Sequence, residues 1–211
     1  MKFKLLFSYR FLLFILSVLG VYLQLTKHGG FGMMLYYTIL SNMLVMFFMG
    51  DMVWRMVRGR STQTQDYLRM KGAVTMAIMI TFVIYHFMLA PLATPEKFYR
   101  LENFLCHYIV PLMFFFDTLV IDKAKQYRKL DPFLWTLIPL AYMLFALLNG
   151  LVLKWPIPGA KDSPFAYFFI NVNKYGWAFV GKWVVIIFIA YLLAGYVLYG
   201  IKNIKRKLAI S

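Results

Sequence analysis

Six long runs of apolar residues alternate with short polar links along the 211-residue chain. An α-helix needs about 20 predominantly apolar residues to cross the hydrocarbon core of a bilayer. The runs cover residues 10–25, 31–54, 72–92, 102–121, 132–153 and 182–201. The links between them are too short for a separate soluble domain. We therefore expect one all-α domain over residues 1–211, a polytopic membrane protein with six transmembrane helices.

Basic residues concentrate in alternate links of this pattern. The chain has 23 Lys and Arg residues against 8 Asp and Glu residues, a formal net charge of +15. With the amino terminus inside, the cytoplasmic segments contain Lys2, Lys4, Arg10, Arg55, Arg58, Arg60, Arg69, Lys71, Lys123, Lys125, Arg128, Lys129, Lys202, Lys205, Arg206 and Lys207. An excess of Lys and Arg in cytoplasmic links sets orientation, so both termini are expected in the cytoplasm. The charge would contact the anionic headgroups of membrane lipids. Nucleic acid is not an expected partner, because it would need exposed aromatics on a soluble face.

The few polar side chains inside the apolar runs occur at helical spacing. Thr38 and Asn42 are four residues apart with Ser41 beside them, and Asn103 and His107 are also four apart. Residues at this spacing share one face of a helix. Lipid offers no hydrogen bonds, so each pair should face the interior of the bundle. Such groups are costly in hydrocarbon and therefore indicate a functional site.

The same groups lie at a similar depth. With a rise of about 1.5 Å per residue, Thr38 lies roughly 10 Å from the outer start of the second span. His86 lies roughly 9 Å from the outer end of the third span, and His107 roughly 8 Å from the start of the fourth. Asn149 lies roughly 6 Å from the end of the fifth. Four polar residues from four helices are thus expected in one layer of the outer leaflet.

This layer contains the parts of a hydrolytic site. A hydroxyl becomes a useful nucleophile when a base removes its proton, and His is the usual base. We therefore expect Thr38 and His107 to be catalytic, with Ser41 as the alternative nucleophile.

Four further residues are expected to support the pair. Asn side chains can orient an imidazole or donate to an oxyanion, which suits Asn42, Asn103 and Asn149. His86 would be a second polar anchor. The competing interpretation is structural. An intramembrane Thr often bonds to the carbonyl four residues earlier, and a His can simply join two helices.

Asp117 is too distant to complete a triad. It follows His107 by ten residues, about 15 Å along a helix. Near the inner end, at the level of Asp51 and Asp122, it is expected to pair with a basic loop residue. Cys106 is the only cysteine, which excludes an intrachain disulfide and a multi-cysteine metal site. It is expected to be a buried packing residue.

The link at 154–181 is the longest outer link. Pro156, Pro158 and Gly159 disfavour helix near its start, and the aromatic run 165–170 follows. This run is too short to span a bilayer and too apolar for water. It is expected to lie at the interface or to dip back over the site as a lid, with a simple aromatic anchor as the alternative.

These motifs resemble those of the androgen-induced, FAR-17a-type family of integral membrane proteins. The segment 35–42, Leu-Tyr-Tyr-Thr-Ile-Leu-Ser-Asn, resembles the Thr-bearing segment of that family, and 107–111, His-Tyr-Ile-Val-Pro, resembles its His-containing segment. Animal members are threonine hydrolases that cleave fatty acid esters of hydroxy fatty acids. The resemblance implies Thr38 as nucleophile and His107 as its partner. It also implies a compact bacterial-type member in the plasma membrane, acting on a lipid or fatty-acid ester without a cofactor. Asn171 stands where the family would carry an acidic residue.

Two other classes of function remain open. His86 and His107 could be axial ligands of a haem, or could bind a quinone, because two histidines at one depth are the minimum for one haem. A lipid-binding or transport protein is the second class, although the chain has no internal repeat and its polar groups lie off the midplane. A metal hydrolase is less favoured, since only His28 and Glu102 are left as further ligands.

Overall fold

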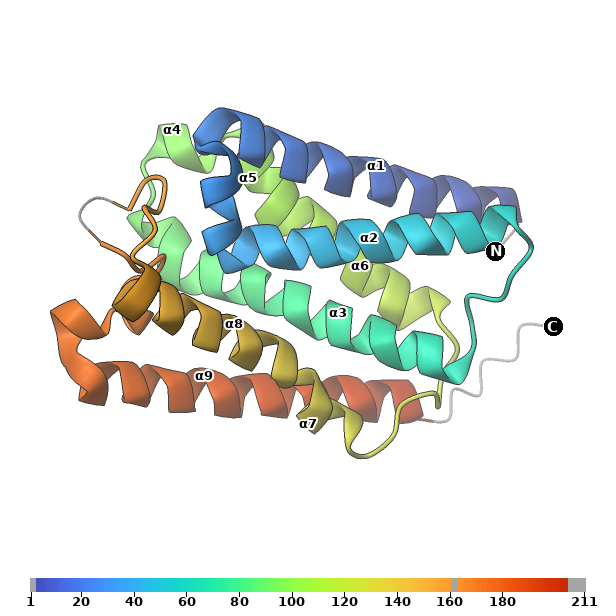
Figure 1. Cartoon of the computed structure of the whole chain (residues 1–211). Coiled ribbons are helices and arrows are strands. Elements are labelled where there is room, and N and C mark those ends of the chain that lie inside the picture. Colours follow the sequence, from blue (N-terminus) through green and yellow to red (C-terminus); the bar gives the residue numbers. More distant parts are fainter. Residues whose placement is uncertain (1–2, 161–162, 205–211) are drawn as a thin grey trace.

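A computed structural model describes residues 3–160 and 163–204 of the chain (Figure 1). All regular secondary structure within these residues is helical, and six helices are long and apolar enough to cross a membrane. The expected all-α, six-span fold is therefore confirmed, and the chain is an integral, multi-pass membrane protein. The spans are Phe3–His28, Tyr37–Val57, Gln65–Leu92, Leu101–Ile121, Asp131–Leu153 and Val172–Asn203.

Two of the spans are single α-helices, α1 (Phe3–His28) and α2 (Tyr37–Val57). The sixth span, α9 (Val172–Asn203), is helical on both sides of a kink at Gly176. In the third span, α3 (Gln65–Ile84) continues as the π-helical turn η2 (Tyr85–Leu89) and the 3₁₀ turn η3 (Ala90–Leu92). The fourth span consists of α5 (Leu101–Phe104), η4 (Leu105–Ile109), α6 (Val110–Phe116) and η5 (Asp117–Ile121). The fifth consists of α7 (Asp131–Trp135), α8 (Leu137–Leu148) and η6 (Asn149–Leu153). Short elements lie in the links: η1 (Gly30–Leu35), α4 (Pro95–Phe98) and η7 (Phe168–Ile170).

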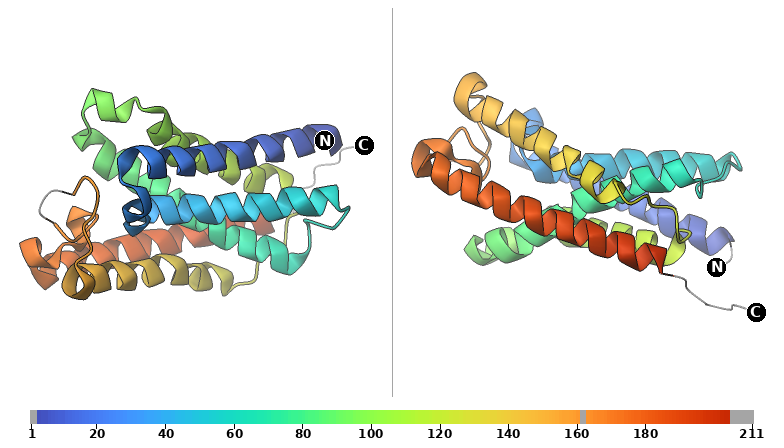
Figure 2. Two further views of the ribbon diagram at one scale, coloured as in Figure 1. Left: turned by 45° about the horizontal axis from the view of Figure 1, so that its top comes forward. Right: turned by 90° about the horizontal axis from the view of Figure 1, so that it is seen from below.

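The third span is the centre of the bundle. α1 and α2 lie side by side, α3 packs against α2 and α6, and α8 and α9 lie on the opposite side of α3 (Figures 1 and 2). The main apolar core is formed by fully buried side chains of α1, α2, α3 and α6, such as Leu13, Val45, Met49, Ile78 and Phe114. Cys106 is fully buried, as expected.

The two ends of the bundle differ in their links. We call the end formed by residues 29–36, 93–100 and 154–171 the site end. We call the opposite end, where α1 begins and α9 ends, the terminal end (Figure 1).

Four spans begin at other residues than the apolar pattern suggested. The first begins at Phe3 and the third at Gln65, each seven residues before the expected 10 and 72. α2 begins at Tyr37 instead of near residue 31, because Gly30–Leu35 winds as a 3₁₀ helix and Tyr36 has extended backbone angles (φ −93°, ψ 132°). α9 begins at Val172, ten residues before the expected 182, and is bent at Gly176. Thr38 is consequently the second residue of its helix, at the very end of the bundle.

The terminal end holds a buried ionic cluster of Arg10, Lys71, Asp117 and Asp122. The Arg10 guanidinium donates to both carboxylate oxygens of Asp117, at 2.9 and 3.0 Å, and lies 3.3 Å from Asp122 Oδ1. The Lys71 ammonium pairs with Asp117 and with Asp122 Oδ2, the latter at 2.7 Å. Asp117 therefore pairs with basic residues, but both belong to helices, α1 and α3, and not to a loop as expected.

Candidate active site

The start of α2 places the Thr38 backbone where a helix has no internal hydrogen-bond partner. The first N–H groups of an α-helix lack an acceptor four residues earlier. The Thr38 N–H donates instead to the Tyr167 hydroxyl oxygen, at a long N···O distance of 3.4 Å. The Thr38 side chain is half-buried. It thus stands at the rim of the bundle, next to a phenol from a remote link.

His107 brings its imidazole to the Thr38 hydroxyl. Its Nε2 lies 3.3 Å from Thr38 Oγ1, and its Nδ1 lies 3.0 Å from the backbone carbonyl oxygen of Asn103. A carbonyl can only accept, so the proton of the neutral ring resides on Nδ1. The Nε2 lone pair is therefore left facing Thr38, and the Thr38 hydroxyl donates to it.

A π-helical turn sets the direction of His107. Pro111 has no N–H and cannot bond the carbonyl of His107 four residues earlier. The backbone there adopts the wider π-helical geometry of η4, which contains His107. Such π-turns within α-helices are frequent at functional sites.

Tyr85 and Asn103 hold the His107 ring in place. The Tyr85 ring stacks on the imidazole with a centroid separation of 3.8 Å and an interplanar angle of 22°. The Asn103 amide donates to the Tyr85 hydroxyl at 2.6 Å and to the Phe98 carbonyl at 2.8 Å. His107 is only 7% exposed, so the ring has little freedom to turn.

Asn42 joins the two helices that carry the pair. Its side-chain amide is fully buried and donates to the carbonyl of Thr38 at 2.8 Å and to that of Cys106 at 3.0 Å. These two bonds connect α2 with η4 directly beside Thr38 and His107. Asn42 therefore holds the distance between nucleophile and base but contacts neither reacting atom.

Ser41 faces a different helix. Its hydroxyl lies 2.7 Å from the Thr81 hydroxyl of α3 and donates to the Thr38 carbonyl at 3.1 Å. Of the two hydroxyls that the sequence left open, Thr38 is the one that the structure brings to the imidazole.

Two expected site residues lie elsewhere at the site end. The His86 side chain is exposed, its Nδ1 lies 3.2 Å from the Tyr108 hydroxyl, and its ring stacks on Phe82. It points away from Thr38, because Tyr85, the residue before it, occupies the inward face. A helix has a direction around its axis, and a residue's depth along the helix does not determine that direction.

Asn149 does not contact Thr38 or His107, but it holds part of the 154–171 link by hydrogen bonds. Its amide donates to the carbonyls of Trp155 and Pro164, at 3.3 and 3.1 Å, and its carbonyl oxygen accepts the Trp155 N–H at 3.1 Å. Next to it, the Phe165 ring packs directly on Gly150, where any side chain would collide with it. The link is thereby bound to the end of the fifth span.

The 154–171 link dips into the bundle and delivers Tyr167. Phe165 and Tyr167 are buried, at 2% and 8% exposure, and pack with Tyr37 and the residues of η7. Burial raises the pKa of Tyr167 above its usual value of 10.0, so its hydroxyl is protonated at neutral pH and can donate. Tyr167 was missed as a site residue. The aromatic run was visible, but the path that brings this one hydroxyl to Thr38 depends on contacts with distant residues.

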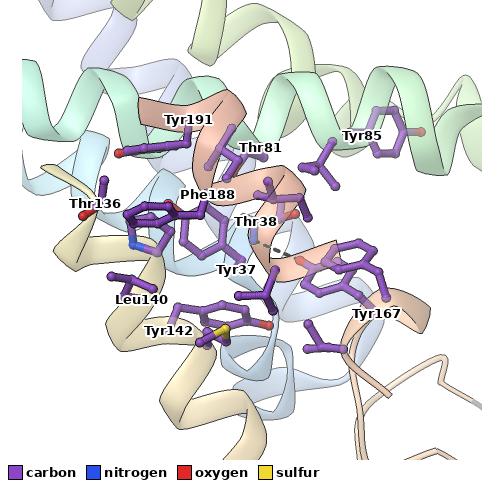
Figure 3. A pocket seen from close by; sticks show the side chains of 18 of the residues that line it. Tyr37, Thr38, Thr81, Tyr85, Thr136, Leu140, Tyr142, Tyr167, Phe188 and Tyr191 are labelled. Atoms are coloured by element: carbon purple, nitrogen blue, oxygen red, sulfur yellow. Dashed lines mark hydrogen bonds between the residues drawn. The ribbon is translucent and has the colours of Figure 1, made fainter. Parts of the chain in front are cut away.

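An apolar cavity opens beside Thr38. Thr38, Tyr85 and Tyr167 are part of its wall, and α3, α8 and α9 supply most of the rest (Figure 3). About 860 Å³ of space lies between these side chains, including the part that opens outward. Its lining is mostly apolar with a few polar groups, as in small-molecule sites.

The other histidines are engaged away from His107. His28 Nε2 lies 2.9 Å from Glu102 Oε1, whose partner oxygen also contacts Lys27. His86 faces Tyr108, so the pair of imidazoles that a haem would need is not brought together in the described residues. Among these residues, no group of three or more His, Cys, Asp or Glu side chains could hold a metal ion.

No protein-family model, curated protein or solved structure matches this chain.

Proposed function

We propose that this membrane protein is an intramembrane hydrolase of lipid esters, with Thr38 as nucleophile and His107 as general base. The observation that carries the proposal is the Thr38 Oγ1–His107 Nε2 contact of 3.3 Å, with Nδ1 bound to the Asn103 carbonyl. A base that is oriented by a third group, with its free nitrogen on a hydroxyl, is the arrangement that activates a nucleophile.

Acylation follows from the positions of four groups. Thr38 Oγ1 attacks the ester carbonyl while its proton passes to His107 Nε2. The negative charge on the carbonyl oxygen is stabilised by the Tyr167 hydroxyl, whose oxygen accepts the Thr38 N–H in front of the start of α2 and whose proton is left to donate. When the tetrahedral intermediate collapses, His107 returns the proton to the leaving alcohol.

Deacylation reverses these roles. Water gives its proton to His107 Nε2 and attacks the acyl group on Thr38, and the fatty acid leaves as Thr38 regains its proton. The resemblance to the androgen-induced family suggests fatty acid esters of hydroxy fatty acids as the substrate class. The half-buried position of Thr38 beside an apolar cavity supports an ester with an alkyl group that can enter this cavity.

The proposal includes an orientation. The terminal end carries a group of basic residues, namely Arg55, Arg58, Arg60 and those of link 122–130. Basic links favour the cytoplasmic side of a membrane. The site end would then face outward, in a bacterial-type plasma membrane. On intact cells an impermeant maleimide should react with Gly159→Cys, and it should react with Ser61→Cys only after the cells are lysed. Reaction of Ser61→Cys from the outside would reverse the orientation.

A covalent probe tests the chemistry. Purified protein is incubated with a fluorophosphonate and read by intact mass, together with the Thr38→Ala, Ser41→Ala and His107→Ala variants. We expect an adduct on the wild type and on Ser41→Ala, and none on the other two. Labelling of folded Thr38→Ala protein at the wild-type rate would refute the assignment of the nucleophile.

A further inference from the structure

The cavity beside Thr38 is elongated along the bundle. Its walls come from α3, α8, α9 and η7, and its side chains include Ile80, Ile84, Leu140, Met143, Val184 and Ile187. Figure 3 shows Tyr85 and Tyr167 at one end and Thr136 and Tyr191 at the other. The Tyr191 hydroxyl donates to the Trp135 carbonyl, and Thr136 donates to the Phe133 carbonyl. The polar groups of this far end are thus satisfied within the protein, and the cavity offers an occupant an apolar surface.

Helices α7 and α9 approach closely toward the terminal end, where a Cβ at Gly195 would lie 3.2 Å from Pro132 Cβ. Toward the site end α8 and α9 run further apart (Figure 2). There Met143 and Val184 are half-buried although they line the cavity. The lining between α8 and α9 is therefore partly exposed on the side that faces lipid.

The length of the cavity matches a medium alkyl chain. Tyr142 makes an edge-to-face contact with Tyr37, next to Thr38, with a centroid separation of 5.0 Å. Thr136 lies six residues before Tyr142, and Tyr191 lies seven after Val184, which corresponds to roughly 10 Å along each helix. An extended, staggered alkyl chain advances about 1.3 Å per carbon. About eight carbons therefore separate a carbonyl at Thr38 from the far end.

We propose that this cavity is the acyl pocket, which takes a saturated chain of about eight carbons through the gap between α8 and α9. The assignment rests on the proposed function, because it places the ester carbonyl at Thr38. Tyr191 and Thr136 form the floor, Phe188 and Leu140 form the walls near it, and the leaving alcohol extends toward the site end. Esters whose acyl chain fills the pocket gain the burial of each methylene, which is worth about a fourfold change per carbon. Longer chains gain no more.

Two substitutions near the floor of the cavity, each with a matched control, test the predicted chain length. The kcat/KM of protein in lipid nanodiscs is measured for p-nitrophenyl esters of four to sixteen carbons, and the wild type should be fastest near eight. Phe188→Ala should raise the twelve-carbon to eight-carbon ratio roughly tenfold, and Leu140→Trp should lower the eight-carbon to four-carbon ratio by a similar factor. Ile189→Ala and Ala141→Trp change the neighbouring exposed positions and should leave both ratios unchanged. Ratios that move no more in the lining variants than in the controls would overturn the assignment.

A binding measurement separates the pocket from the chemistry. Thr38→Ala protein is irradiated with an octanoyl ester that has a diazirine at its terminal carbon, and adducts are mapped by mass spectrometry. Adducts near Thr136 and Tyr191 that excess octanoyl ester suppresses would support the pocket, even if the wild type hydrolyses nothing and the catalytic proposal fails. Adducts confined to the exposed faces of α8 and α9 would refute the pocket, even if the wild type is an active esterase.

Discussion

The terminal end and the site end differ in how closely their polar groups are paired. The terminal end holds a buried ionic cluster with short ion-pair contacts, formed by Arg10, Lys71, Asp117 and Asp122. At the site end, the contact between Thr38 and His107 is longer. The carboxylates of Asp117 and Asp122 each contact both cations. Thr38 makes contacts of 3.3 and 3.4 Å and borders a cavity. Two positive and two negative groups offset each other in the ionic cluster, while Thr38 lines a cavity and its hydroxyl contacts one ring nitrogen of His107.

This difference separates stability from function. Removing one partner of a buried ion pair leaves an uncompensated charge, which is strongly destabilising. A hydroxyl that makes one long hydrogen bond contributes little to folding, since a typical bond is worth about 1 kcal/mol net. The site end therefore keeps groups that can react, and the terminal end keeps groups that join α1, α3 and the fourth span. Substitutions at the site end should therefore lower activity with little effect on stability, and substitutions in the ionic cluster should lower stability.

The largest effect is expected from Thr38→Ala. Loss of the nucleophile should lower kcat for a lipid ester at least a thousandfold, about 4 kcal/mol of transition-state free energy. The free energy of unfolding should change by less than about 1 kcal/mol. Activity is measured in nanodiscs and stability by unfolding in mixed micelles. Ser41→Ala is the control, because Ser41 bonds Thr81 and should keep most activity. A Thr38→Ala protein that is active, or inactive only because it is unfolded, would contradict the comparison.

The opposite signature is expected from Asp117→Asn. Arg10 and Lys71 would share one remaining carboxylate in a site with no exposure, and the free energy of unfolding should fall by about 3–5 kcal/mol. The matched control is Asp51→Asn. Its carboxylate is 41% exposed and pairs with Arg55, so the loss should be about 0–1 kcal/mol. Equal, small losses in both variants would show that the ionic cluster does not stabilise the bundle.

The fold was predictable because the bilayer constrains it so strongly. Six apolar runs indicated six helices, and the inward direction of Asn42, Asn103 and His107 followed from the lack of hydrogen-bond partners in lipid. The helix ends were not predictable to the residue. Hydrophobicity continues from residue 31 into α2, while the change from 3₁₀ to α-helix at Tyr36 depends on backbone conformation.

The candidate site was only partly predictable. Thr38 and His107 were found from depth and spacing, because both are polar residues in apolar helices. Tyr167 lies in a link whose path depends on Phe165 packing against Gly150. His86 lies on the exposed face of the third span, because the neighbouring Tyr85 is the residue that faces inward.

Tyr167→Phe should have the next largest effect. It removes one oxyanion donor and leaves the ring packed in place, so kcat should fall about a hundredfold with KM little changed. Tyr36→Phe is the matched control. Its hydroxyl anchors the same link by donating to the Pro158 carbonyl at 2.6 Å, and it lies away from the reacting groups. Similar losses in both variants would mean that Tyr167 merely fixes the link.

Asn149→Ala should displace the Tyr167 hydroxyl indirectly, by loosening the link that carries it. The variant loses the three hydrogen bonds to Trp155 and Pro164, which should cost about 1–3 kcal/mol of stability. Activity should fall roughly tenfold as Tyr167 loses its position. Hydrogen exchange should become faster in residues 155–160 and 163–171 but not at His107. Unchanged exchange in the link, with the same loss of activity, would place Asn149 in the chemistry instead.

The smallest effect is expected from His86→Ala, and it tests whether depth alone makes a site residue. His86 is exposed and its contacts are Tyr108 and Phe82, so the free energy of unfolding should change by no more than about 0.5 kcal/mol. Hydrolysis should stay within twofold of wild type, whereas His107→Ala should abolish it. An optical spectrum of both variants provides the second measurement. A visible absorption band that disappears in both would establish His86 and His107 as joint ligands of a haem and refute the hydrolase. A loss of hydrolysis in His86→Ala without such a band would instead require this face of the third span to take part in the chemistry.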